Sequence, residues 1–223
     1  MKIRTIISVL LLSVSLCGAT AQSKTARKMA RQGMVDITTV APSVKVSLMY
    51  SRADNFTGRV LYGDLREAYL HPLAAKALKK AQQRLKQLRP DLSLKVYDAA
   101  RPMHIQQKMW DAVKKTNHSF YVSNPKNGGG LHNYGLAVDL TLSKLNGDTI
   151  PMGTKVDNMD YRSHIDKEYA LLKAHKLTRE EYNNRRLLRQ VMEYAGWKAL
   201  RTEWWHFNLR TRAQAKKYFK VIP

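Results

Sequence analysis

Apolar residues recur at helical spacing in three parts of the chain. The first predicted helix opens at Pro72, a position where the missing N–H costs nothing, and ends near residue 88. The second follows Pro102, and the third begins at a T-x-x-E capping box made by Thr178 and Glu181. The face of the first helix that is expected to be buried comprises Leu73, Ala77, Leu78, Ala81, Leu85 and Leu88.

Shorter apolar or alternating stretches predict strands, at 44–48, 92–96, 137–142 and 204–209. In the third of these, Val138, Leu140 and Leu142 face one way, whereas Asp139 faces the other. Helices and short strands are mixed without a regular strand–helix alternation. The pattern therefore predicts an α+β fold, a single domain with a small, mostly antiparallel sheet flanked by helices.

The first 21 residues have the parts of a signal peptide. Lys2 and Arg4 form a basic start, residues 6–16 are an apolar run too short to span a bilayer comfortably, and 19–21 is an A-x-A cleavage motif. We expect an exported protein, periplasmic or secreted, with a mobile basic leader at 22–33 and its functional domain within 22–223. A lipid anchor on Cys17 is the alternative, disfavoured because Leu16 stands where a small residue is expected.

Composition narrows the class of protein further. The 223 residues include 39 Lys and Arg against 17 Asp and Glu, a formal net charge of +22, and a single cysteine. One cysteine excludes a disulfide framework and a Cys-rich zinc module. The positive charge favours binding to polyanions. Because the protein is expected to be exported, the expected polyanion is an anionic cell wall or membrane surface rather than nucleic acid. A solvated, colloidally stable surface would account for the same charge. No feature indicates an obligate protein partner.

Residues suited to metal binding or catalysis first occur close together at 132–139. His132 lies at the mouth of a Gly-rich loop, and Asp139 lies on the polar face of the strand that follows. An Asp between Val138 and Leu140 needs something to compensate its charge, and a metal ion would do so. An Asp hydrogen-bonded within a hairpin and a His at a loop end would explain the same residues without a metal.

The second group of such residues is Glu203-Trp204-Trp205-His206. Two His and one carboxylate leave the fourth tetrahedral position of zinc open for water, so we assign His132, Asp139 and His206 as ligands of one Zn²⁺ per chain. Glu203 is then the candidate general base and acid. Positions three apart in a strand point to opposite faces, so Glu203 must lie at a bend. An exposed carboxylate paired with Arg201 or Arg210 is the alternative for Glu203.

Arg101 follows the predicted strand at 92–96 and precedes Pro102. There it would aim a fixed cation at an oxyanion on a scissile carbonyl. An ordinary surface arginine is the alternative in so basic a chain.

Seven motifs occur in order between residues 54 and 210. They are Asp54-Asn55-Phe56-Thr57-Gly58, Asp98-x-x-Arg101-Pro102, His132-x-x-Gly135-x-Ala137-x-Asp139-Leu140-Thr141-Leu142, Pro151-Met152-Gly153, Met159-Asp160-x-Arg162-Ser163-His164, Asn184-Arg185-Arg186 and Glu203-Trp204-Trp205-His206. Together they closely resemble the VanX-like D-alanyl-D-alanine dipeptidases of the zinc M15 peptidase group.

The resemblance implies a zinc site on the sheet and a role for each candidate residue. His132, Asp139 and His206 match the zinc ligands, Glu203 the catalytic base, and Arg101 the arginine that stabilises the transition state. The resemblance also implies that Asp157 receives the free ammonium of the substrate, and that a small pocket limits substrates to dipeptides such as D-Ala-D-Ala, in cell-wall metabolism.

Two departures and two rival functions accompany the resemblance. The family usually has a serine pair before the first zinc histidine, where this chain has Gly130 and Leu131, and Ala99-Ala100 replaces a common Gly-Tyr. These changes are expected to affect substrate preference and the pocket wall.

A zinc D,D- or L,D-carboxypeptidase that trims peptidoglycan stem peptides would share the ligands and base. A non-catalytic wall-binding module would not need Glu203.

Overall fold

The computed structural model describes residues 22–223, so the expected signal peptide and Cys17 lie outside the described residues. In chain order the helices and strands are α1 (Lys24–Arg31), β1 (Val35–Asp36), α2 (Ile37–Val40), β2 (Lys45–Val46), β3 (Tyr69–Leu70), α3 (Pro72–Leu88), β4 (Leu92–Asp98), α4 (Met103–Val113), β5 (Ala137–Lys144), α5 (Glu168–Lys173), α6 (Arg179–Tyr194), β6 (Lys198–Leu200), β7 (Glu203–Asn208) and α7 (Arg212–Tyr218).

A mixed sheet of five strands forms the centre of the molecule, in the order β2-β4-β5-β7-β6. Only the β2–β4 pair is parallel, and the other three pairs are antiparallel. A second, two-stranded antiparallel sheet joins β1 to β3. The predicted α+β fold, one domain with a small and mostly antiparallel sheet, is confirmed.

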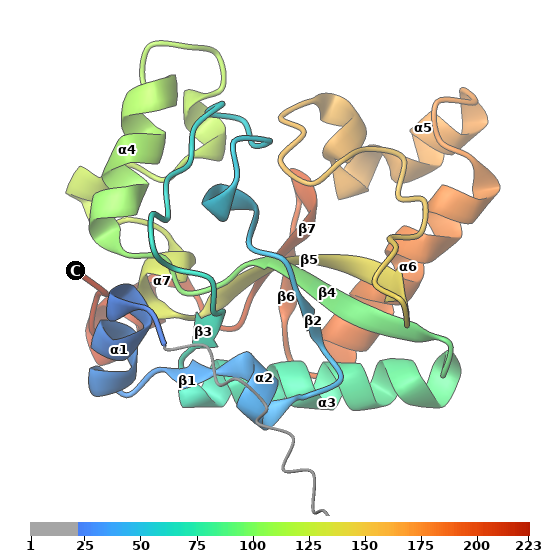
Figure 1. Cartoon of the computed structure of the whole chain (residues 1–223). Helices are drawn as coiled ribbons and strands as arrows, with labels where there is room; N and C mark the ends of the chain where they lie inside the picture. Colours follow the sequence, from blue (N-terminus) through green and yellow to red (C-terminus); the bar gives the residue numbers. More distant parts are fainter. Residues whose placement is uncertain (1–21) are drawn as a thin grey trace, which may run out of the picture.

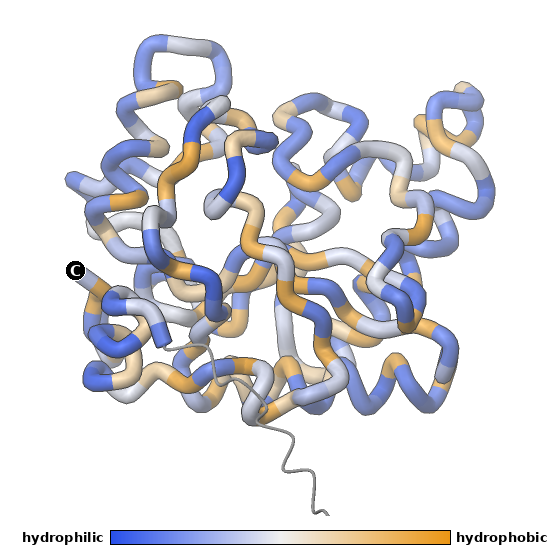
Figure 2. Tube along the Cα trace, viewed as in Figure 1, coloured by the Kyte–Doolittle hydropathy of each residue, from blue (hydrophilic) through white to orange (hydrophobic). Residues whose placement is uncertain are grey.

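Helices α3 and α6 pack together against one face of this sheet, α3 against β4 and α6 against β5 and β7. Figure 1 shows α3 along the lower side of the sheet, with α4 and α5 on the other side at its two ends. Hydrophobic and hydrophilic positions alternate along α3 in Figure 2, as expected for a helix with one buried face. Along β5 the core residues Val138, Leu140 and Leu142 alternate with Asp139 and Thr141, which therefore lie on the opposite face of the strand.

Local signals account for where the long helices begin and end. The His71 side chain caps the N-terminus of α3, and Pro72 occupies its first turn. At the start of α6, Thr178 and Glu181 make the predicted capping box, and Gly196 follows its end at φ +90°, the left-handed region that glycine tolerates.

The buried stripe of α3 differs from the prediction at both ends of the helix. Leu73 is 46% exposed and Leu88 is 37% exposed. The stripe runs through Ala74, Leu78 and Leu85, and Leu73 precedes it by one step of about 100° around the helix axis. The expectation that Leu73 and Leu88 are buried is wrong.

The expectation of a mobile leader at 22–33 is also wrong. Residues 24–31 form α1, whose N-terminus is capped by the Ser23 hydroxyl. Ser23 also donates a 2.9 Å hydrogen bond to Glu67, and Ala26 and Met29 are fully buried in the core. Burial of these two side chains stabilises a segment whose basic residues point to solvent. Among the residues described, no helix is long and apolar enough to cross a membrane.

Candidate metal centre

The pairing of β4, β5 and β7 places three polar residues in one row across the sheet. Asp139 on β5 lies opposite Asp98 on one side and opposite His206 on the other. An irregularity in the pairing between Val96 and Asp98 makes Tyr97 an extra residue in β4, and such a bulge re-aims the side chains next to it. His132 enters the row from a 3₁₀ turn, Leu131–Tyr134, just before β5.

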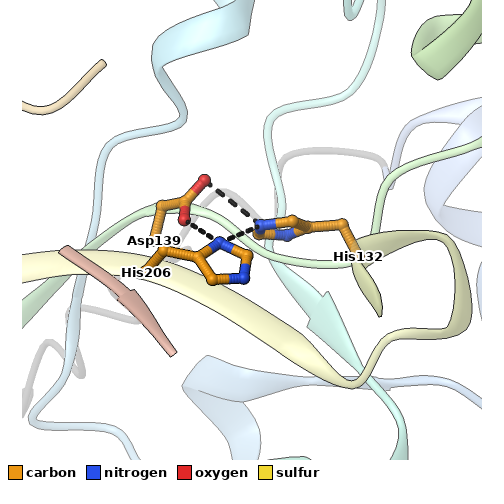
Figure 3. A group of neighbouring side chains, drawn as sticks. All are labelled: His132, Asp139 and His206. Atoms are coloured by element: carbon orange, nitrogen blue, oxygen red, sulfur yellow. Dashed lines mark hydrogen bonds and ion pairs between the residues drawn. The ribbon is translucent and has the colours of Figure 1, made fainter. Parts of the chain in front are cut away.

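His132, Asp139 and His206 converge on one point (Figure 3), and their donor atoms all lie within 4.8 Å of one another. His132 Nε2 lies 3.2 Å from an Asp139 oxygen and 3.2 Å from His206 Nδ1. His206 Nδ1 lies 2.9 Å from the other Asp139 oxygen. Asp139 is buried, but the two imidazoles hold its pKa well below the ordinary value, so it is a carboxylate.

Hydrogen bonds on the far side of each ring determine which nitrogens face the centre as lone pairs. His132 Nδ1 donates to the Ala99 carbonyl at 2.7 Å, which leaves a lone pair on Nε2. His206 Nε2 donates to Asn208 Oδ1 at 2.9 Å, which leaves a lone pair on Nδ1. When both rings are neutral, their two lone pairs and the carboxylate repel one another unless a cation lies between them. These residues therefore fit a zinc ion, which prefers this donor set.

Glu203 opens β7 and lines the same cavity as the three converging residues. The pairing of β6 with β7 is irregular, because Ala199 lies opposite Phe207 while Leu200 already lies opposite Glu203. This departure from regular strand geometry lets Glu203 and His206 reach one cavity, as the bend expected from sequence requires. Glu203 is half-buried, not an exposed surface carboxylate, and Arg201 pairs with Asp166 instead.

The environment of Glu203 raises the pKa of its carboxyl group. Burial raises its pKa to about 8, helped by the charge of Asp139 and opposed by His206. A carboxyl whose pKa lies near neutrality is suited to taking a proton and releasing it again.

Arg101 is buried and held by its own neighbours, which excludes the surface-arginine alternative. Its Nε donates to Asp98 at 2.9 Å, its Nη2 also contacts Asp98, and its Nη1 donates to Gln106 at 2.9 Å. Burial alone would lower the pKa of Arg101, but Asp98 and the nearby tyrosines raise it above the ordinary value. The guanidinium is thus a permanent cation 3.8 Å from Asp139.

Asp157 reaches the cavity from the loop between β5 and α5. The Tyr50 hydroxyl lies 2.8 and 3.0 Å from its two carboxylate oxygens and donates to them. Asp157 has φ +64°, a left-handed conformation that costs a non-glycine residue free energy and that is concentrated at functional sites. Burial and the charge of Asp139 raise the pKa of Asp157 to about 7.

Helix α6 fastens the loop that carries Asp157. Asn184 Nδ2 donates to the Pro151 carbonyl at 2.8 Å. The buried Arg185 donates from Nε to the Met152 carbonyl at 2.6 Å and from Nη1 to the Arg162 carbonyl at 2.9 Å. Arg185 thus bridges the two arms of the loop on either side of Asp157.

All the site residues expected from sequence line one cavity of about 410 Å³, and they are Arg101, His132, Asp139, Asp157, Glu203 and His206. Gly130 and Leu131 line it as well, whereas Ala99 and Ala100 are buried and do not. Ala99 acts through its carbonyl, which orients His132.

Sequence reasoning gave no role to Tyr50, Asp98 or Gln106, yet each holds a site residue in place. Tyr50 binds Asp157, and its ring lies 5.3 Å from the Arg101 guanidinium carbon. Asp98 also accepts a hydrogen bond from Tyr62. The one available signal was the Asp98-x-x-Arg101 spacing, since a strand end followed by a tight turn returns Arg101 to Asp98.

Comparison with known proteins gives a consistent result. A family model described as D-ala-D-ala dipeptidase matches residues 30–223. The chain is 34% identical over 176 residues to the D-alanyl-D-alanine dipeptidase of Escherichia coli (strain K12), which covers 79% of this chain and 84% of that protein. It is 30% identical over 204 residues to the D-alanyl-D-alanine dipeptidase of Enterococcus faecium, covering 84% and 96%. With the protein of the same description from Streptomyces coelicolor, identity is 31% over 186 residues, covering 76% and 88%.

Proposed function

Because the chain belongs to the M15 peptidase family of D-Ala-D-Ala dipeptidases, we propose that it hydrolyses D-Ala-D-Ala or a related D-amino-acid dipeptide with the help of zinc. The observation that carries this proposal is the convergence of two imidazoles and a carboxylate beside Glu203. The cavity of about 410 Å³ lies toward the small end of the ~300–1,000 Å³ range of small-molecule sites, in keeping with a dipeptide.

In this proposal His132, Asp139 and His206 hold the zinc ion. When bound, the metal supplies Lewis acidity, which lowers the pKa of water and polarises a carbonyl. The Glu203 carboxylate takes a proton from the attacking water and gives it to the nitrogen of the leaving amine, so that the peptide C–N bond breaks and two amino acids are released. The Arg101 guanidinium stabilises the negative charge that develops on the carbonyl oxygen.

The test of this function is a side-by-side assay of D-Ala-D-Ala, L-Ala-D-Ala and a longer stem peptide. We expect rapid release of D-Ala from D-Ala-D-Ala, loss of activity after chelation and recovery on adding zinc. Preferential cleavage of the stem peptide would instead favour the carboxypeptidase, and no cleavage of any peptide by the zinc-loaded protein would contradict a hydrolytic role.

Asp157 is proposed to bind the substrate ammonium, which would place an opposite charge beside its half-buried carboxylate. A charge-assisted hydrogen bond contributes about 1.5–3 kcal/mol, so Asp157→Asn should lower kcat/KM for D-Ala-D-Ala by about 10- to 150-fold, mainly through KM. N-acetyl-D-Ala-D-Ala should not be cleaved by the unmodified enzyme. Asp111→Asn, on the exposed end of α4, is the matched control. Equal cleavage of the acetylated and free dipeptides would contradict this role of Asp157.

We also propose that the protein is exported and that it associates with an anionic surface of the cell envelope. Residues 1–21 have the composition of a signal peptide, and residues 68–90 contain six Lys and Arg but no acidic residue. Lys76, Lys79 and Lys80 lie on the exposed side of α3. Cell fractionation should find the protein outside the cytoplasm, held to the envelope at low salt and released as salt screens the attraction. Such a location would suit a role in recycling cell-wall fragments.

A further inference from the structure

The Ser123 side chain occupies space that a side chain at position 130 would need. A Cβ added to Gly130 would lie 3.0 Å from the Ser123 hydroxyl oxygen and 3.3 Å from the Ser123 Cβ. Gly130 has φ −105°, a conformation open to any residue. The packing of Ser123, and not the backbone conformation, therefore favours glycine at position 130.

A buried amide fixes the main chain of Ser123 relative to Arg101. Gln106 on α4 is 1% exposed, and its Nε2 donates to the Ser123 carbonyl at 2.8 Å. The Oε1 of the same side chain accepts from Arg101 Nη1 at 2.9 Å. Gln106 therefore fixes the position of Ser123 relative to the Arg101 guanidinium, the group that we propose stabilises the oxyanion.

The Ser123 hydroxyl is available to a ligand. Ser123 lines the same cavity as Arg101 and Glu203 and, within residues 22–223, its hydroxyl makes no hydrogen bond to another protein group. A hydroxyl offers one donor and two acceptor positions, and a substrate in the cavity would use them.

Ser123 and Asp157 are connected to different sides of Arg101. Asp157 is bound by Tyr50, whose ring lies against the guanidinium, whereas Ser123 is bound by Gln106 at the Nη1 end. With the ammonium at Asp157, the dipeptide still presents its peptide group and its carboxylate. We propose that Ser123 is a substrate-binding residue whose hydroxyl forms a hydrogen bond with the dipeptide main chain. This inference rests on the proposed function.

The exchange of two side chains tests the inference. Ser123→Ala removes one oxygen from a partly exposed wall and should lower kcat/KM for D-Ala-D-Ala by about 3- to 10-fold, mainly through KM, with unchanged zinc content and melting temperature. Gly130→Ser alone should also lower it, because the new Cβ crowds Ser123. In Ser123→Gly with Gly130→Ser, the hydroxyl at 130 enters the vacated space, and kcat/KM should return to within about 2-fold of the unmodified enzyme.

Ser119→Ala, on the preceding turn and outside the cavity lining, is the control and should match the unmodified enzyme. The inference is overturned if Ser123→Ala keeps full kcat/KM, or if the double variant is as poor as the product of the losses measured in Ser123→Gly alone and in Gly130→Ser alone. Failure of the unmodified enzyme to cleave D-Ala-D-Ala would overturn the proposed function instead, so the two failures are distinguishable.

Discussion

Replacing Glu203 by Gln is expected to lower kcat for D-Ala-D-Ala by about 10²- to 10⁴-fold while the zinc content of the protein stays unchanged. Glu203 shares the cavity with the three converging residues but does not belong to their cluster. A glutamine fills the same volume and cannot accept the proton from water. Turnover is therefore lost, whereas metal binding, which depends on His132, Asp139 and His206, is kept.

Metal analysis beside steady-state kinetics checks this expectation, with the exposed Glu193→Gln on α6 as the control. The control should keep both zinc and turnover. If Glu203→Gln lost zinc together with activity, Glu203 would be a ligand and the proposed division of roles would be wrong.

His132→Ala and Asp139→Ala are expected to show the opposite pattern, loss of zinc and of activity together. The unmodified protein should bind about one zinc per chain, and removal of one of three protein ligands leaves too few to retain the ion through mild purification. His104→Ala, on the exposed side of α4, is the matched control. Full zinc content in either ligand variant would refute the assignment.

Asn208 offers a graded version of the same test. Its Oδ1 accepts from His206 Nε2, so it orients the ring without facing the metal. Loss of such an orienting partner typically lowers metal affinity or activity by about 10- to 100-fold. Asn208→Ala should therefore bind zinc at high zinc concentration and lose it on dilution. Its zinc affinity should lie between that of the unmodified protein and that of His132→Ala.

The parts of the fold that could be predicted from sequence depend on neighbouring residues. The bounds of α3 follow from Pro72 and Pro90, and the start of α6 follows from Thr178 and Glu181. The strand at β5 was predicted because its alternation extends over several residues. The lone carboxylate on its polar face also singled out Asp139.

What could not be predicted depends on contacts between distant segments. Glu203 and His206 share a cavity because β6 and β7 pair irregularly, and regular alternation alone would have separated them. The contacts of Tyr50 with Asp157 and of Gln106 with Ser123 join segments that no local pattern connects. Sequence likewise shows no side chain at Gly130 but cannot show that Ser123 fills its place.

The attachment of the Asp157 loop to α6 has a consequence for how the site opens. Asn184 and Arg185 donate three hydrogen bonds to main-chain carbonyls of the loop, and none of the three belongs to the pairing of β4, β5 and β7. A fluctuation that breaks these bonds would release Asp157 as a local unfolding unit while the row of metal-facing side chains stays intact. Amide hydrogen exchange should then be faster at 151–162 than in β5. The enzyme would lose its affinity for the substrate amine before it lost its metal. Recognition and chemistry thus rest on parts of one small domain with separate local stabilities.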